Sequence, residues 1–335
     1  MGKALRSIVI GFLIVAVGLS MVLVGSWQGG GSEVLWHHGR FWVPQSKQIQ
    51  ANYPNIKSLD IQGDNLDITV KSNPELKKGM QVTGHVTNAT GLSMQTNQQK
   101  LTLSYHDAVN KMPSFSDTIN VNEQVVIQVP ANTKLQDVKL KTTSGDLTLK
   151  QVQIFKLKTR NNFGQTRLQQ TEGQQITLAS QVGLLNLDRS QAKHLKLDSV
   201  SGLLQVHGVK LEQTQMHVVQ ADVNVDHSQL GQTSLNIGSG NTNWKYVSAQ
   251  ELLAQTGEGN YQLDQVQLYG TNVITTNRGN ITTAKLQTKG YRLEVQNTGI
   301  NMWHGQKKPH SFMKNNHVDD QVVLATYDGN ITVNQ

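Results

Sequence analysis

The sequence predicts an all-β protein built as a β-solenoid or β-helix, a stack of coils that are each 19 or 20 residues long. Three observations predict this fold: turn glycines recur at a constant spacing, apolar and polar residues alternate after each glycine, and the composition suits short strands. Aromatic residues make up 5% of the chain and charged residues 16%, while Gln, Asn, Thr, Ser and Gly fill much of the remainder. Such a composition is typical of polar-faced strands rather than of helices.

The glycine spacing defines the repeat from Leu135 onward. The positions of the regular series, one of them an alanine, follow one another at intervals of 19 and are Gly145, Gly164, Gly183, Gly202, Ala221, Gly240 and Gly259. Two steps of 20 lead to Gly279 and Gly299, and a step of 30 leads to Gly329, which indicates a repeat with an insertion near residues 305–315. The series predicts about ten coils and, at roughly 4.8 Å per coil, a rod about 50 Å long.

The columns of the repeat predict which side chains face inward. Two and four residues after the glycine stand mostly apolar residues, such as Leu204 and Val206, and the residue between them, such as Gln205, is polar. This period of two places one set of side chains on the inner face of every coil. The first column slips at Asn301, where we expect Ile300 to replace it. A unit this short cannot bury its apolar face alone, so it must stack on its neighbours.

The rest of the array follows from the same pattern. Residues 53–134 contain a first coil at 56–70 and then longer strands that break the register, and we expect these strands to cap the solenoid, whose open end would otherwise expose unpaired backbone groups. Residues 135–335 form the repeat array with its insertion. Residues 27–52 are predicted to be a tether between the array and the amino-terminal segment.

The amino-terminal segment predicts a single transmembrane helix. Residues 7–26 carry no charge over 20 positions, which is long enough to span a bilayer. A signal-peptide core usually covers about 7–15 residues and ends at a small-residue cleavage site, so we favour a retained signal anchor over cleavage. Lys3 and Arg6 then place the stub of residues 1–6 in the cytoplasm and everything after the span outside the cell.

Aromatic residues gather just after this span. Trp27, Trp36, Phe41 and Trp42 are candidates for contact with membrane lipid, because aromatic rings prefer the headgroup layer. The alternative is an ordinary flexible tether.

Charge and cysteine content narrow the function classes. The net charge is +7 and the isoelectric point is about 9.4, which favours polyanionic partners. The Lys and Arg residues are scattered rather than clustered with aromatics, so nucleic acid is not expected as a partner, and an anionic wall polymer or phospholipid fits better. The chain has no cysteine, which excludes disulfides and thiol chemistry.

No phosphate-binding loop, serine-nucleophile elbow or zinc-protease pair is present, so the sequence predicts no enzyme and no cofactor. One candidate site emerges from the register, five residues after the corner: the outward column of Asp188, His207, Asp226, Lys245 and Asp264. Its carboxylate, imidazole and carboxylate groups can in principle hold a metal or act as acid and base. The favoured alternative is a charge ladder that fixes the coil register.

The insertion supplies a second candidate site. Lys307, Lys308 and Lys314 are expected to lie on a mobile basic loop that touches a polyanion such as teichoic acid or phospholipid.

Three segments carry a resemblance to a known family. The strand Val125 to Pro130, the unit Thr142 to Leu149, and weaker copies at Ser201-Gly202 and Tyr327 to Val333 are similar to the bacterial β-strand-repeat family labelled "putative adhesin", a domain of unknown function. The likeness covers about residues 53–335. It implies a membrane-anchored cell-envelope protein of the Gram-positive type and supplies no catalytic residue. The corners at Gly164 and Gly183 depart from the family's Ser-Gly-Asp form.

These observations favour a non-enzymatic, single-pass surface protein of the cell membrane, with its carboxy-terminal domain extracellular. It would bind or sense an anionic envelope component or an envelope protein partner, or act as an adhesin. One alternative is a β-helix enzyme acting on polysaccharide, for which Asp188 and Asp226 would be essential carboxylates. The other is a scaffold whose coils self-associate end to end.

Overall fold

The computed structural model describes residues 11, 13–18, 20, 35–37, 40–42, 46–106, 123–315 and 317–334. The described residues of the amino-terminal segment, 11, 13–18 and 20, are helical. No helix among the described residues combines the length and the apolar character that crossing a bilayer requires. Most of the predicted span at residues 7–26 lies outside the described residues.

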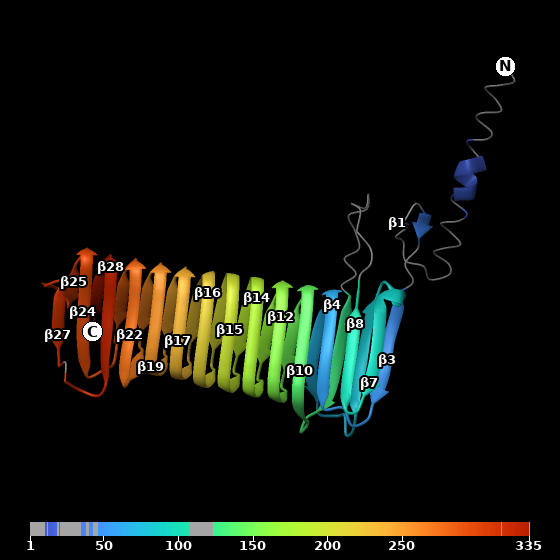
Figure 1. Cartoon of the computed structure of the whole chain (residues 1–335), viewed down its shortest axis with the longest axis horizontal. Helices are drawn as coiled ribbons and strands as arrows, with labels where there is room; N and C mark the ends of the chain where they lie inside the picture. Colours follow the sequence, from blue (N-terminus) through green and yellow to red (C-terminus); the bar gives the residue numbers. More distant parts are fainter. Residues whose placement is uncertain are drawn as a thin grey trace, which may run out of the picture.

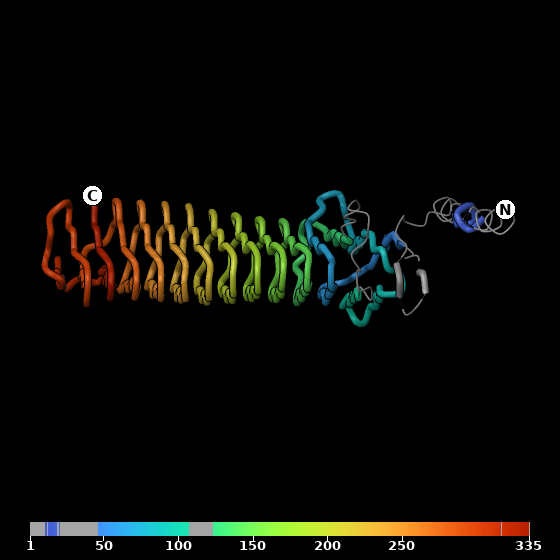
Figure 2. The backbone as a smooth tube through the Cα atoms, turned by 90° about the horizontal axis from the view of Figure 1, so that it is seen from above, coloured from blue at the N-terminus to red at the C-terminus, as the bar shows by residue number. Residues whose placement is uncertain are grey.

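The described chain is all-β, as predicted. A short hairpin of β1 (Leu35–His37) and β2 (Arg40–Trp42) forms its own sheet, and the other 27 strands join one continuous sheet. That sheet winds into an elongated rod (Figure 1), and the view from above shows coil stacked on coil along the rod axis (Figure 2). Successive coils pair in parallel with an offset of 19 residues, as between Leu185 and Leu204. The solenoid-like fold predicted from the glycine spacing is therefore confirmed.

Each regular coil has a long strand before the corner glycine and a four-residue segment after it, and in three coils the two merge into one strand. The strands of this part are β10 (Lys134–Ser144), β11 (Leu147–Lys150), β12 (Gln153–Phe163), β13 (Thr166–Gln169), β14 (Glu172–Asp188), β15 (Gln191–His207), β16 (Lys210–Asp226), β17 (Gln229–Ser239), β18 (Thr242–Lys245), β19 (Ser248–Glu258), β20 (Tyr261–Asp264), β21 (Gln267–Tyr269), β22 (Thr271–Arg278) and β23 (Ile281–Ala284).

The core runs through the middle of the rod as continuous columns of apolar side chains. Leu204 and Val206 are each 1% exposed, whereas Gln205 between them remains partly exposed. The alternation holds from coil to coil because parallel pairing places equivalent residues directly beside one another, as Leu187 beside Val206. The predicted inward register is therefore correct.

The corner glycines are required by both conformation and space. Gly183 has φ +147, and a Cβ built on it would lie 1.9 Å from the carbonyl oxygen of Gly164 in the preceding coil. Side-chain-bearing residues rarely adopt such a φ, and no substituent fits at that distance. Glycine at this column thus lets adjacent backbones turn and stack closely.

A second corner lies six residues after the first, and the sequence did not predict it. Residues there adopt the left-handed conformation, and those with side chains have φ between 46 and 56. They are Gln151, Gln170, Arg189, His227, Tyr246, Gln265 and Lys285. Between Gln151 and Lys285 only one residue of this column, Gly208, is a glycine, so the sequence pattern did not indicate the corner.

At the amino-terminal end, the predicted first coil at residues 56–70 is not the end of the stack, because β8 (Lys100–Tyr105) and β9 (Gln124–Pro130) form a further, outer coil. β4 (Ser58–Asn65) lies between β10 and β8, and β5 (Asp67–Asn73) lies between β11 and β9. Three antiparallel strands cover this outer coil, with a single turn of 3-10 helix (Ala89–Gly91) between two of them. They are β3 (Lys47–Tyr53), β6 (Met80–Val86) and β7 (Leu92–Asn97). Because β3 pairs with β6 from Lys47 onward, the predicted tether boundary at residue 52 is six residues too late.

At the carboxy-terminal end, the spatial order of the coils differs from their order in sequence. The last coil, β28 (Gln321–Asp328) and β29 (Ile331–Asn334), pairs with β22 and β23 on one side. On its other side it pairs with β24 (Gly290–Thr298) and β25 (Asn301–Trp303). The chain end thus lies between two coils that precede it in sequence, and Figure 1 shows β28 between β22 and β24.

The prediction of a mobile loop near residues 305–315 is wrong. β26 (Gln306–Lys308) pairs antiparallel with β25, and β27 (Ser311–Lys314) pairs antiparallel with β24. These strands form because β24 and β25 end the stack and present unpaired backbone groups that need partners.

The prediction that Ile300 replaces Asn301 is wrong as well. Asn301 is fully buried and pairs with Ile331 in the inward column. Its side-chain amide donates hydrogen bonds to the carbonyl oxygens of Pro309 (2.7 Å) and His310 (2.8 Å), which holds the turn between β26 and β27 against the end of the rod.

Candidate functional site

A bend repeats near the start of each long strand and shapes one face of the rod. Near the start of each long strand the parallel pairing skips one residue at the same place, at Gln136, Phe155, Gln174, Lys193 and Glu212. The residues on either side of the skipped one pair regularly, so each long strand turns there without leaving the sheet. Stacked coils repeat the turn along one face of the rod.

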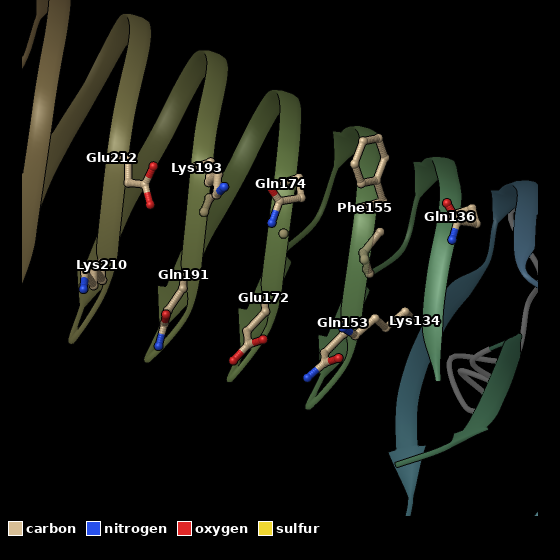
Figure 3. A pocket seen from close by; sticks show the side chains of 13 residues that line it. Lys134, Gln136, Gln153, Phe155, Glu172, Gln174, Gln191, Lys193, Lys210 and Glu212 are labelled. Carbon is tan, nitrogen blue, oxygen red and sulfur yellow. The ribbon is translucent and has the colours of Figure 1, made fainter. Parts of the chain in front are cut away.

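A groove follows this bend across the first coils of the array (Figure 3). It has a volume of about 570 Å³. Its charged and aromatic side chains come from five coils and are Lys134, Phe155, Glu172, Lys193, Lys210 and Glu212. Amide groups of Gln136, Gln153, Gln174 and Gln191 fill the positions between them. The ring of Phe155 is 54% exposed although it belongs to a strand of the rod, so it presents an apolar surface among polar groups.

Two further hollows adjoin this groove and reach later coils of the rod. A neighbouring hollow of about 530 Å³ shares Lys210 and Glu212 with the first, and it shares His194 with a third hollow of about 610 Å³. In the third hollow, side chains of adjacent coils are linked by a hydrogen bond: the amide of Gln232 donates to the carboxylate of Glu251 at 2.7 Å. The three hollows together form one surface, hereafter the axial groove. The sequence pattern does not reveal this surface, because the skipped residues share no residue type.

The predicted charged column is formed as a column but not as a uniform row. Asp188, His207, Asp226, Lys245 and Asp264 stand side by side on successive coils. Asp188 turns to Arg189, whose guanidinium approaches its carboxylate at 2.9 Å, and Lys245 places its ammonium over the ring of Tyr246, 5.2 Å from the centroid. The expected contact of His207 with two carboxylates therefore does not form.

Instead, a compact cluster forms around Asp226, hereafter the His-Asp-His cluster. Nδ1 of His207 lies 3.1 Å from Oδ2 of Asp226, and Nδ1 of His227 lies 2.7 Å from Oδ1 of the same carboxylate. Burial acts to raise the pKa of the Asp226 carboxyl, but hydrogen bonds with His227 and His207 outweigh it and hold that pKa below its usual value. The contact of His227 was not predicted from the sequence, because strict alternation would point its side chain away from Asp226.

The family assignment follows from comparison with known sequences. The model of the Toastrack family, a domain of unknown function (DUF4097), matches residues 56–234 and again residues 200–334. This chain belongs to the Toastrack family. The two matches together cover the whole rod except its first strand, and they agree with the predicted resemblance to the "putative adhesin" type.

Solved structures similar to this Toastrack chain carry related descriptions. One is described as a putative cell adhesion protein from Clostridium sporogenes, with 10% identity, a TM-score of 0.22, and coverage of 87% of this chain and 99% of the other. Another is described as a putative adhesin from Bacteroides fragilis, with 12% identity, a TM-score of 0.35, and coverage of 87% and 98%. The comparison with curated proteins gave no match.

The lysines predicted to contact a polyanion lie on the carboxy-terminal cap of this Toastrack rod. The ammonium of Lys308 lies 5.5 Å from the ring centroid of Phe312, and that of Lys314 lies 5.1 Å from the ring of Trp303. Two of the three lysines thus pack over aromatic rings of the cap, and Lys307 is exposed on β26.

The predicted membrane-interface residues fall at the edge of what the structure describes. Trp27 lies outside the described residues. The backbones of Trp36, Phe41 and Trp42 belong to the β1–β2 hairpin, in which Trp36 pairs with Phe41. Contact of these residues with lipid stays a prediction.

Proposed function

We propose that this Toastrack protein is a non-enzymatic cell-envelope surface protein that binds an extended anionic wall polymer along the axial groove. The observation that carries the proposal is the continuity of the groove, whose three sections share residues from coil to coil. A polymer with a repeating backbone can lie along such a surface and repeat its contacts. The groove is shallow and open rather than enclosed, which favours binding along its length over binding of a small compact ligand.

The chemistry of the groove suits a polyhydroxylated chain with negative charges. Lys134, Lys193 and Lys210 provide ammonium groups at intervals along the rod, and glutamine amides between them offer both donors and acceptors to hydroxyl groups. The exposed ring of Phe155 provides a flat apolar surface. The net charge of +7 attracts a polyanion from a distance.

The proposal includes a location and an anchor. Residues 7–26 would cross the membrane as a single helix, with residues 1–6 in the cytoplasm and the stack of about ten coils outside. Aromatic residues of the following segment would then lie near the outer headgroup layer. The groove would face the wall polymers that surround the membrane.

Binding measurements on the full-length chain in mild detergent test the proposal. The probes are poly(glycerol phosphate), uncharged wall glycan strands and vesicles of phosphatidylglycerol. We expect the double variant Lys193→Gln and Lys210→Gln to lose most of its affinity for the polyanion. Addition of Phe155→Ala to this double variant should lower the affinity further. The matched control is Lys141→Gln, because Lys141 is an exposed lysine on β10 that does not line the groove.

Equal polymer affinity of the groove variants and the control would exclude the axial groove as the binding surface. Tight binding to the vesicles without binding to either polymer would show that the anionic partner is a lipid surface, which overturns the proposal of a wall polymer.

A further inference from the structure

We infer that the His-Asp-His cluster is a binding site for a divalent transition-metal ion of the zinc class. It comprises His207, Asp226 and His227, one donor atom of each lying within 4.8 Å of the others. Two imidazoles and a carboxylate are ligands that zinc, nickel and copper accept in proteins. The site is separate from the axial groove, and nothing in the proposed function requires it.

The donor spacing already approaches what a metal ion needs. Two ligands bound about 2.1 Å from a tetrahedral ion stand roughly 3.4 Å apart. His207 Nδ1 and Asp226 Oδ2 are 3.1 Å apart, and His227 Nδ1 is 2.7 Å from the other carboxylate oxygen. Small rotations of exposed side chains therefore suffice to bring three donors around one ion.

The backbone positions these residues for a physical reason. His207 and Asp226 end β15 and β16, and parallel pairing sets them side by side on adjacent coils. His227 follows directly and has φ 46, so the chain turns there and its imidazole stays on the same side as the carboxylate of Asp226. Adjacent residues of a regular strand would point to opposite faces.

The neighbouring coils leave this site open. The residue that corresponds to His227 one coil earlier is Gly208, which has no side chain to intrude between the two imidazoles, and their ring centroids are 5.7 Å apart. On the other side, the ring of Tyr246 packs 4.6 Å from that of His227 and limits its movement. The side chains of His207 and Asp226 are 53% and 41% exposed, so an ion can enter from solvent and keep water at its remaining positions.

Titration of the tag-free, full-length chain in mild detergent with ZnCl₂ at neutral pH tests this inference. We expect one saturable site per chain, and we expect His207→Gln and His227→Asn each to weaken zinc binding at least about tenfold. Asn is chosen at position 227 because it tolerates the left-handed conformation. Melting of each variant in EDTA confirms that it is folded.

The matched control is His217→Gln. His217 is an exposed histidine of β16 that also faces an aspartate, Asp198, of the preceding coil, but it is not part of the cluster. The His217→Gln variant should bind zinc with the same affinity as the wild type. Absence of a saturable site in the wild type, or equal zinc affinity of wild type and His227→Asn, would show that the cluster is only an ion pair between imidazoles and a carboxylate.

Discussion

At the scale of single residues, the position of a side chain within its coil decides its role. The residues two and four places after the corner are buried in coil after coil, and the residue between them faces outward. One residue after the corner, asparagines form a different kind of column. The side-chain oxygen of Asn260 accepts the backbone N–H of Asn280 at 2.8 Å, and that of Asn280 accepts the N–H of Asn330 at 2.8 Å. Burial and a hydrogen-bonded ladder thus hold the same coils together.

The inward columns predict large effects of truncation. Leu204→Ala should lower the free energy of unfolding by roughly 2–4 kcal/mol, because it opens a cavity in a fully packed column. Gln205→Ala should change it by about 0.5 kcal/mol or less, because that side chain remains partly solvated. Chemical denaturation of both variants measures the difference, and equal losses at positions 204 and 205 would contradict the register.

The asparagine ladder predicts a smaller effect. Asn260→Ala removes the acceptor of the Asn280 backbone N–H and the 3.0 Å hydrogen bond that the Asn260 amide donates to Oδ1 of Asn241, so we expect a loss of about 1 kcal/mol in the free energy of unfolding. Gln262→Ala, at an exposed outward position two residues later, is the control and should have little effect. If the two variants unfold at the same denaturant concentration, the ladder does not contribute to stability.

At the scale of elements, the sequence predicted the repeating coils but not their ends. Strict alternation and the glycine column at Gly183 and Gly202 carry their signal in every repeat, so the register of β14 and β15 could be read directly. The burial of Asn301 could not be predicted in this way, because it depends on carbonyl groups supplied by the turn between β26 and β27. The sequence predicted that the charged residues from Asp188 to Asp264 lie side by side. It did not predict the contact of His227 with Asp226, because that contact depends on a left-handed turn at a position without a glycine.

An ion pair at the start of the last coil predicts a dependence of stability on pH. The ammonium of Lys289 lies 2.7 Å from Asp320, and the backbone N–H of Gly270 donates to the same carboxylate. The hydrogen bond from Lys289 and that from Gly270 hold the pKa of the Asp320 carboxyl below its usual value. A depressed pKa in the folded state means that the stabilisation is present above the unfolded pKa of about 3.9 and is lost as pH falls through the folded value.

Asp320→Asn should therefore melt at a lower temperature than the wild type at pH 6, and the two melting temperatures should converge as pH falls below the lowered pKa of Asp320. Thermal unfolding followed by circular dichroism at a series of decreasing pH values measures this. A difference that stays the same over the whole series would show that the carboxylate charge has no part in it.

At the scale of the whole molecule, antiparallel strands pair with the outermost parallel strands at both ends of the rod. Such capping opposes end-to-end addition of a second copy, so the structure does not favour the predicted alternative of a scaffold that stacks its coils. The sides of the rod, including the axial groove, remain available to partners.

A truncation tests how the carboxy-terminal end is held together. In a chain that ends at residue 318, β24 and β25 lose the parallel partners β28 and β29, so residues 290–303 should lose protection against hydrogen exchange although they are still present. Residues 171–226 in the middle of the rod should keep their protection and serve as the internal control. Wild-type protection of residues 290–303 in this variant would contradict the interleaved order.

The interleaved last coil also constrains how the molecule is made. A ribosome delivers residues 290–314 before residues 321–334, yet the later segment occupies the layer beneath the earlier one. Folding that follows synthesis from one end to the other can complete the stack only as far as β23, and the outermost layer must wait until residues 321–334 have been made. The same order limits how the protein can lengthen during evolution: whole coils can be duplicated in the middle of the array, whereas β29 lies between β23 and β25 and offers no free edge on which a further coil could stack.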